Sequence, residues 1–199
     1  MGMFSRKDMI RLFGPLLVEQ LLAVLVGMAD VVMVAAVGET AVSGVALVDS
    51  ISVLVIQVLS AMATGGAVVC SQYIGKKKPD QACRAAGQLV LITAALSLLI
   101  AAVAFIGNRH LLRLIFGSVE TAVMDNAQTY FWFTAMSYPF LALYNSGAAL
   151  FRSMGNSKIS MQASIIMNVI NVIGDALFIF GFHWSVAGAA GASLISSMT

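Results

Sequence analysis

Long apolar runs, separated by glycine, proline or charged residues, divide the chain into six segments. They span approximately residues 11–37, 44–72, 84–106, 122–150, 160–181 and 185–199. At 1.5 Å per residue, each of the first five is long enough to cross a hydrocarbon core of about 30 Å as a helix. The sixth reaches only about 22 Å, and no capping or charged residue follows it. The pattern predicts an all-α integral membrane protein whose sixth transmembrane helix is truncated.

Composition strengthens this prediction. Hydrophobic residues make up 60% of the chain and charged residues only 10%, whereas a soluble domain carries roughly 25% charged residues. The chain therefore has too few charges to cover a water-facing surface. No block of like charge suggests a nucleic-acid partner, and two cysteines without a nearby histidine provide neither a disulfide framework nor a zinc site.

The basic residues are unevenly divided between the two sides of such a bundle. If the amino terminus is cytoplasmic, the outer side holds only Arg109 and Arg113. By the positive-inside rule we expect a multi-pass protein of the plasma (bacterial inner) membrane with a cytoplasmic amino terminus. The basic residues on the cytoplasmic side would then be Arg6, Lys7, Arg11, Lys76, Lys77, Lys78, Arg84, Arg152 and Lys158.

A polar stripe follows the fifth segment. Ionisable residues inside a spanning helix are unfavourable and usually mark a pathway or a relay. Steps of four, three and four residues place the members of this stripe on one helix face. We expect the face to line a wet cavity; a hydrogen-bonded packing seam is the alternative. The stripe consists of Ser164, Asn168, Asn171 and Asp175.

Counting along the predicted helices places Asp30 and Asp175 in one layer. Asp30 lies about 10 Å and Asp175 about 9 Å below the outer edge, with Asn171 one turn deeper and Ser193 at about 13 Å. Two charged carboxylates in this layer would repel each other. They would share a proton or bind Na⁺ together with amide and hydroxyl oxygens, since oxygen ligands suit a hard cation.

Two further acids have simpler interpretations. Asp49 is expected in the first turns of the second helix, where a carboxylate accepts hydrogen bonds from free backbone N–H groups and interacts favourably with the helix dipole. Glu19 lies nearer the cytoplasmic end, one turn after Pro15. It is either an inner-gate residue or the partner of a cytoplasmic arginine.

The fourth segment carries an aromatic and polar stripe at helical spacing. Aromatic faces near buried acids suit an organic cation, although plain packing would produce the same spacing. Pro139 should bend this helix. With Asn168 of the fifth segment, the candidate substrate-cavity residues of the stripe are Tyr130, Thr134, Tyr138 and Asn145.

Several stretches resemble the multidrug and toxic compound extrusion (MATE) family, most closely the branch named after the DNA-damage-inducible protein F. The first helix and its continuation read GPLLVEQLLAVLVGMADVVMVAAVG and ETAVSGVALVD. The later stretches read ATGGAVVCSQYIGKKKPDQA, ALFRSMGNSK and NVINVIGDALFIFGFHWSVAGAAGAS. The resemblance covers nearly the whole chain.

This resemblance implies a twelve-helix transporter, not an enzyme, in which the chain forms the amino-terminal six-helix lobe and the carboxy-terminal lobe is missing. It implies export of cationic or amphipathic compounds, small organic cations among them, in exchange for H⁺ or Na⁺, with no other cofactor and with the lipid bilayer as surroundings. Asp30 and Asp175 match the acids of the family's first and fifth helices, and Asn171 matches an asparagine of the fifth. Ser193 stands where many members have threonine, and Ala176 where many have proline.

Three alternatives stay open. A lipid-linked oligosaccharide flippase would share the fold but need a cationic groove. An intramembrane aspartyl protease would use Asp30 and Asp175 as a dyad, although Val172 replaces the first glycine of the Gly-x-Gly-Asp motif. Finally, a half-length chain would form a complete transporter as a dimer.

Overall fold

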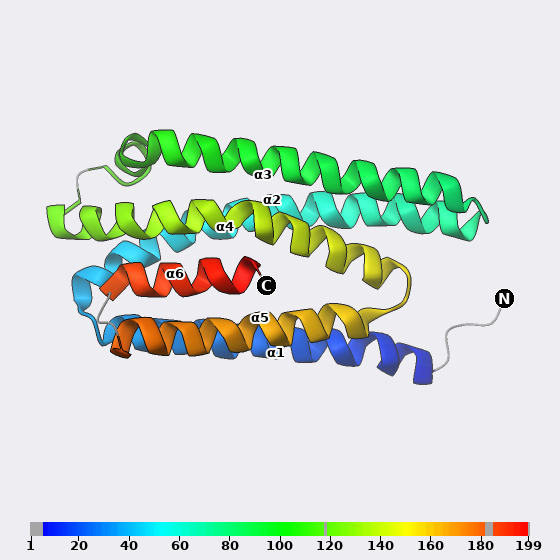
Figure 1. Ribbon diagram of the computed structural model, residues 1–199, viewed down its shortest axis with the longest axis horizontal. Coiled ribbons are helices and arrows are strands. Elements are labelled where there is room, and N and C mark those ends of the chain that lie inside the picture. Colours follow the sequence, from blue (N-terminus) through cyan, green and yellow to red (C-terminus); the bar gives the residue numbers. More distant parts are fainter. Residues whose placement is uncertain (1–5, 118, 182–184, 199) are drawn as a thin grey trace.

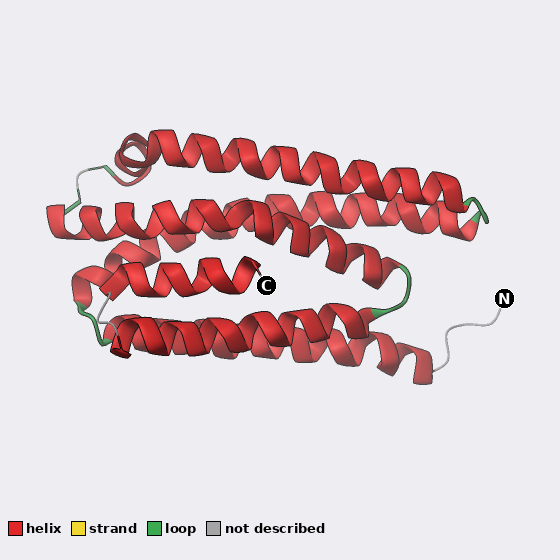
Figure 2. Cartoon of the chain, in the orientation of Figure 1, coloured by secondary structure: helices red, strands yellow, loops and turns green. Residues whose placement is uncertain are grey.

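The chain folds into helices joined by turns. The computed structural model describes residues 6–117, 119–181 and 185–198, and within them no strand occurs (Figures 1 and 2). A π-helical turn, η1 (Leu177–Gly181), directly follows the fifth helix. The predicted all-helical fold is therefore confirmed. The helices are α1 (Arg6–Ala35), α2 (Glu39–Gly75), α3 (Pro79–Phe116), α4 (Thr121–Ser153), α5 (Ser157–Ala176) and α6 (Ser185–Met198).

Two of the helices are longer than the apolar runs suggest. α2 begins at Glu39 instead of near residue 44, directly after Gly38, whose φ of 141° is a conformation that favours glycine. An acidic residue in the first helical turn also stabilises this earlier start. α3 continues beyond the predicted end near residue 106, through Arg109 and Arg113, to Phe116. Figure 1 shows its last turns nearly end-on, across the direction of the rest of the helix.

The bundle has two groups of helices. α1 lies along α5, although more than a hundred residues separate them in the sequence, and α2, α3 and α4 pack against one another (Figure 1). The short helix α6 packs against both α4 and α5 and so joins the two groups. This arrangement brings the polar faces of α1, α5 and α6 together.

Four helical stretches are long and apolar enough to cross a membrane, namely Phe13–Ala35, Glu39–Gly75, Pro79–Phe116 and Ser157–Ile179. α4 has sufficient length but is more polar; it packs against α2, α3 and α6, which bury Ser137, Tyr138 and Ser146. α6 has 14 residues and reaches only about 21 Å. The chain is therefore a multi-pass membrane protein whose apolar outer faces suit contact with lipid.

The core between α2 and α4 depends on a close backbone approach. A Cβ at Gly44 would lie 2.9 Å from the backbone nitrogen of Ala127. Small residues that allow such contact are typical of helix packing in membranes. Beside this contact, Val48 and Phe131 are buried, and the fully buried Tyr138 shares a 3.1 Å hydrogen bond with Ser52.

The two ends of the bundle differ in charge. The start of α1, the α2–α3 turn and the α4–α5 turn lie at one end, and the last turns of α3, with Arg109 and Arg113, lie at the other (Figure 1). Basic residues gather at the first end as Lys76, Lys77, Lys78, Arg152 and Lys158.

α4 is one continuous helix, but it changes direction near its middle, where Pro139 cannot donate a backbone hydrogen bond (Figure 1).

Candidate functional site

A small acidic cavity lies where α1, α2, α4, α5 and α6 meet. Its volume is about 120 Å³, and three carboxylates but no lysine, arginine or histidine line it. Such a cavity is too small for a drug-sized ligand, whose pockets measure about 300–1,000 Å³, but it has room for a cation or a few waters. The lining residues are Gly27, Asp30, Val31, Val34, Val45, Asp49, Tyr130, Asp175, Ala189 and Ser193.

Asp175 and Asp30 form the centre of the site. Asp175 is 1% exposed, and neither of its carboxyl oxygens has a hydrogen-bond partner among the described residues. Oδ1 of Asp30 is also buried without a partner there, and the two carboxyl groups lie next to each other. Buried polar groups are rarely left unpaired because desolvation without compensation is unfavourable. The pair is therefore suited to take up a proton or a cation.

Asn171 and Ser193 join α5 to α6 beside this pair. The amide nitrogen of Asn171 donates a 3.1 Å hydrogen bond to the Ser193 hydroxyl. The helices approach closely here, because a Cβ at Gly174 would lie only 2.8 Å from the Cβ of Ala192. The structure thus brings together all four residues that the sequence placed in one layer: Asp30, Asn171, Asp175 and Ser193.

Asp49 is the site residue that the sequence analysis missed. Because α2 begins at Glu39, Asp49 lies in its third turn and not at the helix start, so the expected interaction with free backbone N–H groups is wrong. Instead Asp49 lines the cavity, as does Tyr130, whose phenol interacts with the Asp49 carboxyl group. Helical spacing from Val45, a buried residue four positions earlier, was the signal that could have placed it.

An apolar cluster adjoins the cavity where α1 leads into α2. Val34 and Val45 belong both to the cavity lining and to this cluster, and Tyr130 packs against it. A low-dielectric surrounding strengthens interactions between charges inside the cavity. The other buried members are Ala41, Ile179 and Ala189.

The structure does not bring the candidate substrate residues together. Tyr130 lines the acidic cavity, whereas Tyr138 is fully buried between α4 and α2. The Thr134 hydroxyl bonds to the backbone oxygen of Tyr130 at 2.8 Å, and Asn145 is half-buried. Asn168 lines a different cavity, nearer the other end of α5.

That second cavity, of about 290 Å³, contains Glu19. Both carboxyl oxygens of Glu19 accept hydrogen bonds, from the Tyr144 hydroxyl at 3.0 Å and the Ser160 hydroxyl at 3.1 Å. Arg152 lines the same cavity, but its Nε donates to the backbone oxygen of Ala148. Glu19 therefore connects α1 to α4 and α5 through hydroxyl groups.

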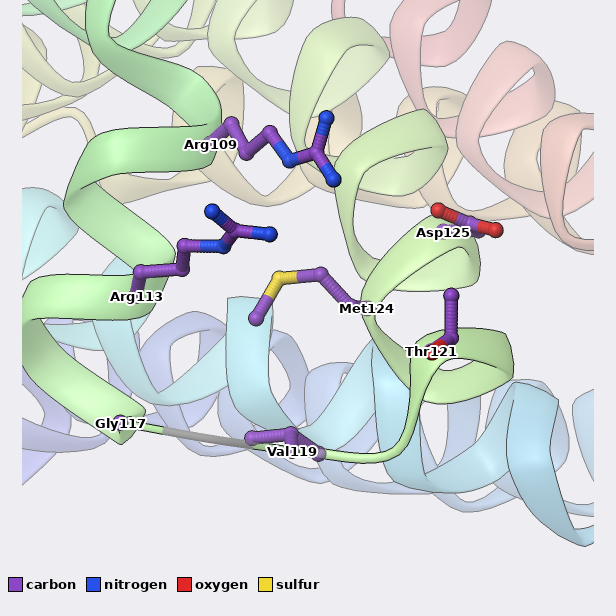
Figure 3. Close-up of a pocket in the computed structure, with 7 residues that line it drawn as sticks. All are labelled: Arg109, Arg113, Gly117, Val119, Thr121, Met124 and Asp125. Carbon is purple, nitrogen blue, oxygen red and sulfur yellow. The ribbon is translucent and has the colours of Figure 1, made fainter.

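A further cavity, which is basic, lies at the far end of α3 and the start of α4. It measures about 370 Å³, and the side chains of Arg109 and Arg113 extend from α3 into it toward α4, where Met124 and Asp125 lie (Figure 3). It shares no lining residue with the acidic cavity. The basic and acidic cavities are thus separate, and only the acidic one has buried, unpartnered carboxyl oxygens.

The acidic cavity provides oxygen atoms as ligands. Within the described residues, no three His, Cys, Asp or Glu side chains converge closely enough to hold one metal ion. The polar atoms that line the cavity are the carboxyl oxygens of the three acids and the hydroxyl oxygens of Tyr130 and Ser193. Oxygen atoms suit a hard cation better than a transition metal.

Comparisons with known proteins agree with this fold. The sequence profile of the MatE family matches residues 15–177, and the chain belongs to that family. It is similar to the uncharacterized transporter YisQ of Bacillus subtilis, with 29% identity over 96% of the chain. It is 24% identical, again over 96% of the chain, to the multidrug export protein MepA of Staphylococcus saprophyticus. The chain spans 42% of the length of each relative.

A solved structure confirms the arrangement of the helices. The chain superimposes with a TM-score of 0.90 and 21% identity on a MOP superfamily transporter from Pyrococcus furiosus, covering 96% of this chain and 42% of that one. That protein is described as having a binding pocket of reverse polarity. Members of the MatE family are transporters, so the alternative of an intramembrane aspartyl protease is set aside.

Proposed function

We propose that this chain is the amino-terminal lobe of a secondary multidrug exporter, which exchanges cationic or amphipathic organic compounds for H⁺ or Na⁺. One observation carries the proposal: Asp175 is buried, its carboxyl oxygens have no partner in the described residues, and it lies beside Asp30 in a cavity without basic residues. The multidrug export protein MepA, a relative over almost the whole chain, supports the substrate class.

The coupling ion would bind in the acidic cavity. With about 120 Å³ of space, the cavity admits a proton, a cation or water but no organic drug. A shared proton would bind between the carboxyl groups of Asp30 and Asp175. Na⁺ would add the amide oxygen of Asn171 and the hydroxyl oxygen of Ser193; the amide nitrogen of Asn171 already donates a hydrogen bond to that hydroxyl.

Ion binding would change the preferred arrangement of the helices. When both carboxylates are charged, repulsion between Asp30 and Asp175 favours separation of α1 from α5. Neutralising the pair removes this repulsion and favours their close packing. A ligand shifts an equilibrium between two states only by its difference in affinity for them, and here that difference comes from the carboxylate pair.

The organic substrate would bind between this lobe and the rest of the protein. The aromatic face of Tyr130 suits an organic cation. Because Tyr130 also lines the ion cavity, ion binding there would alter the contact of Tyr130 with the substrate. Thr134, Asn145 and Asn168 are further candidate contacts, although they do not line the cavity of Tyr130, and Glu19 is a candidate inner gate. The distribution of basic residues supports a cytoplasmic amino terminus in the plasma membrane.

The decisive experiment uses the full-length protein in liposomes. Ethidium movement is followed under imposed H⁺ or Na⁺ gradients, and the wild type is compared with Asp175→Asn. We expect gradient-driven movement that Asp175→Asn abolishes, and the effective gradient identifies the ion. The matched control is Asp125→Asn, which removes an exposed acid of α4 outside the acidic cavity. Unchanged transport by Asp175→Asn would contradict the proposal.

A lipid-linked oligosaccharide flippase remains the second candidate. It would need a cationic groove for a pyrophosphate group, whereas Arg109 and Arg113 line a cavity at the end of α3 and the cavity between α1 and α5 is acidic. If the liposomes show no ethidium movement with either gradient but the protein moves an anionic lipid carrier, this alternative replaces the antiporter.

A further inference from the structure

The three carboxylates of the acidic cavity form two subsites. Asp30 and Asp175 lie next to each other, whereas Asp49 lines the cavity from α2 and interacts with Tyr130 of α4. Within the described part of the chain, no three such groups converge on a point where one metal ion would contact them all. A single bound cation would therefore leave one of the two subsites without a positive charge.

The charges around Asp49 make this imbalance unfavourable. The ionisable or polar groups that line the cavity with it are Asp30 of α1, Tyr130 of α4, Asp175 of α5 and Ser193 of α6. None is basic, and the charge of Asp30 repels that of Asp49. Neutralising only the Asp30–Asp175 pair with one cation leaves at least one negative charge in a cavity beside an apolar cluster. Buried charges are rarely tolerated without a partner.

We infer that Asp49 is a third coupling carboxylate, so that this lobe carries a second positive charge, either a second H⁺ or an H⁺ together with Na⁺, in each transport cycle. The proton comes from water on one side of the membrane, binds to a carboxyl oxygen of Asp49 and is released to water on the other side. Tyr130 is a positioning residue, because its phenol holds the Asp49 carboxylate toward the cavity. The inference rests on the proposed antiport function.

The test measures how many charges drive the export of one substrate molecule. Liposomes containing the full-length protein are given gradients of about tenfold in both H⁺ and Na⁺ at zero membrane potential, and the steady-state ethidium ratio is measured. Each coupled charge that is lost then lowers the attainable ratio about tenfold, whichever ion carried it, as the relation between free energy and equilibrium constant requires. We expect Asp49→Asn to build a ratio about tenfold smaller than the wild type.

Additional variants separate this role from a structural one. Asp49→Glu restores a carboxyl group and should restore the wild-type ratio. Tyr130→Phe keeps Asp49 but removes the hydroxyl that interacts with it, so it should slow transport while leaving the steady-state ratio unchanged. Monodisperse elution in detergent shows that each variant is folded.

The outcomes distinguish this inference from the proposed function. If Asp49→Asn reaches the wild-type ratio while Asp175→Asn builds none, Asp49 carries no charge and only the inference is overturned. A folded Asp49→Asn protein that builds no ratio would also overturn it, because the loss then exceeds one charge. If Asp175→Asn behaves as the wild type, the proposed function itself is overturned.

Discussion

The α1–α5 pair contains two acidic regions, which differ in how their carboxyl groups are paired. We call the region around Glu19 the inner region and the region around Asp30 and Asp175 the outer region, after the proposed orientation of the chain. At the inner region, Glu19 accepts hydrogen bonds from Tyr144 and Ser160 on both of its oxygens. At the outer region, Asp175 is more deeply buried, yet neither of its oxygens has a partner among the described residues. A paired acid contributes to packing, whereas an unpaired buried acid stores unfavourable free energy that a ligand can release. The comparison therefore supports the proposal that coupling belongs to the outer region and helix attachment to the inner one.

The largest expected difference between the two regions is in transport. Asp175→Asn should lower ion-driven ethidium export by more than about tenfold, corresponding to over ~1.4 kcal/mol, because the amide cannot bind a proton or pair with Na⁺. Glu19→Gln preserves an acceptor for Tyr144 and Ser160 and should retain most transport. Liposome fluorescence measures both variants. Equal loss in both would mean that the inner region also couples.

The next effect concerns the scaffold of the outer region. Gly174→Val should destabilise the protein by about 1–3 kcal/mol, the usual range for overpacking, because a Cβ at this position already approaches Ala192 to 2.8 Å. The control is Gly191→Ala on α6, where no neighbouring atom lies within 4 Å of the added Cβ. Thermal unfolding in detergent compares them. A Gly174→Val protein as stable as the wild type would show that the α5–α6 contact is loose.

Stability should also separate the two acids. Glu19→Ala leaves the hydroxyls of Tyr144 and Ser160 without their acceptor and should cost roughly 1–2 kcal/mol. Asp175→Asn removes a carboxylate that has no partner in the described residues, and should leave stability unchanged or increase it. Unfolding midpoints at neutral pH test this difference. A strongly destabilised Asp175→Asn protein would argue for a packing role.

The smallest effect is expected at Ser193. Ser193→Ala removes the acceptor of the Asn171 amide and should weaken apparent ion affinity several-fold, in line with a net hydrogen-bond contribution of about 1 kcal/mol. Ser193→Thr keeps the hydroxyl and should behave as the wild type. The ion concentration that gives half-maximal transport measures both. Identical values for alanine and threonine would remove Ser193 from the outer region's chemistry.

Much of the outer region was predictable from the sequence. The helical repeat places Asn171 and Asp175 on one face of α5, and the rise per residue converts their positions into depth, which matches them with Asp30 and Ser193. Asp49 was not predictable in this way, because an error of five residues in the start of α2 moved it to a helix terminus. Helix ends are set by caps and turns such as Gly38, which the apolar pattern does not reveal.

The inner region was harder to predict for a different reason. The sequence analysis expected a bend at Pro139 but still counted residues on both sides of it as one stripe, which grouped Tyr138 and Asn145 with Tyr130. α4 changes direction near Pro139 (Figure 1), and beyond this point it is Tyr144 that reaches Glu19. A bend changes which face meets a neighbour, so periodicity cannot be extended across it. The pairing of α1 with α5 also depends on tertiary packing that no local pattern contains.

The pairing of α1 with α5 has a consequence for biosynthesis. α1 ends at Ala35 and α5 ends at Ala176, so the ribosome adds 141 residues (176 minus 35) between the two events. At roughly 5–20 residues per second this takes on the order of ten seconds. Throughout this interval Glu19 and Asp30 lack the helix that later encloses them, and they must be sheltered by the insertion machinery or remain protonated in lipid. The final placement of newly made α1 therefore depends on how soon α5 is translated.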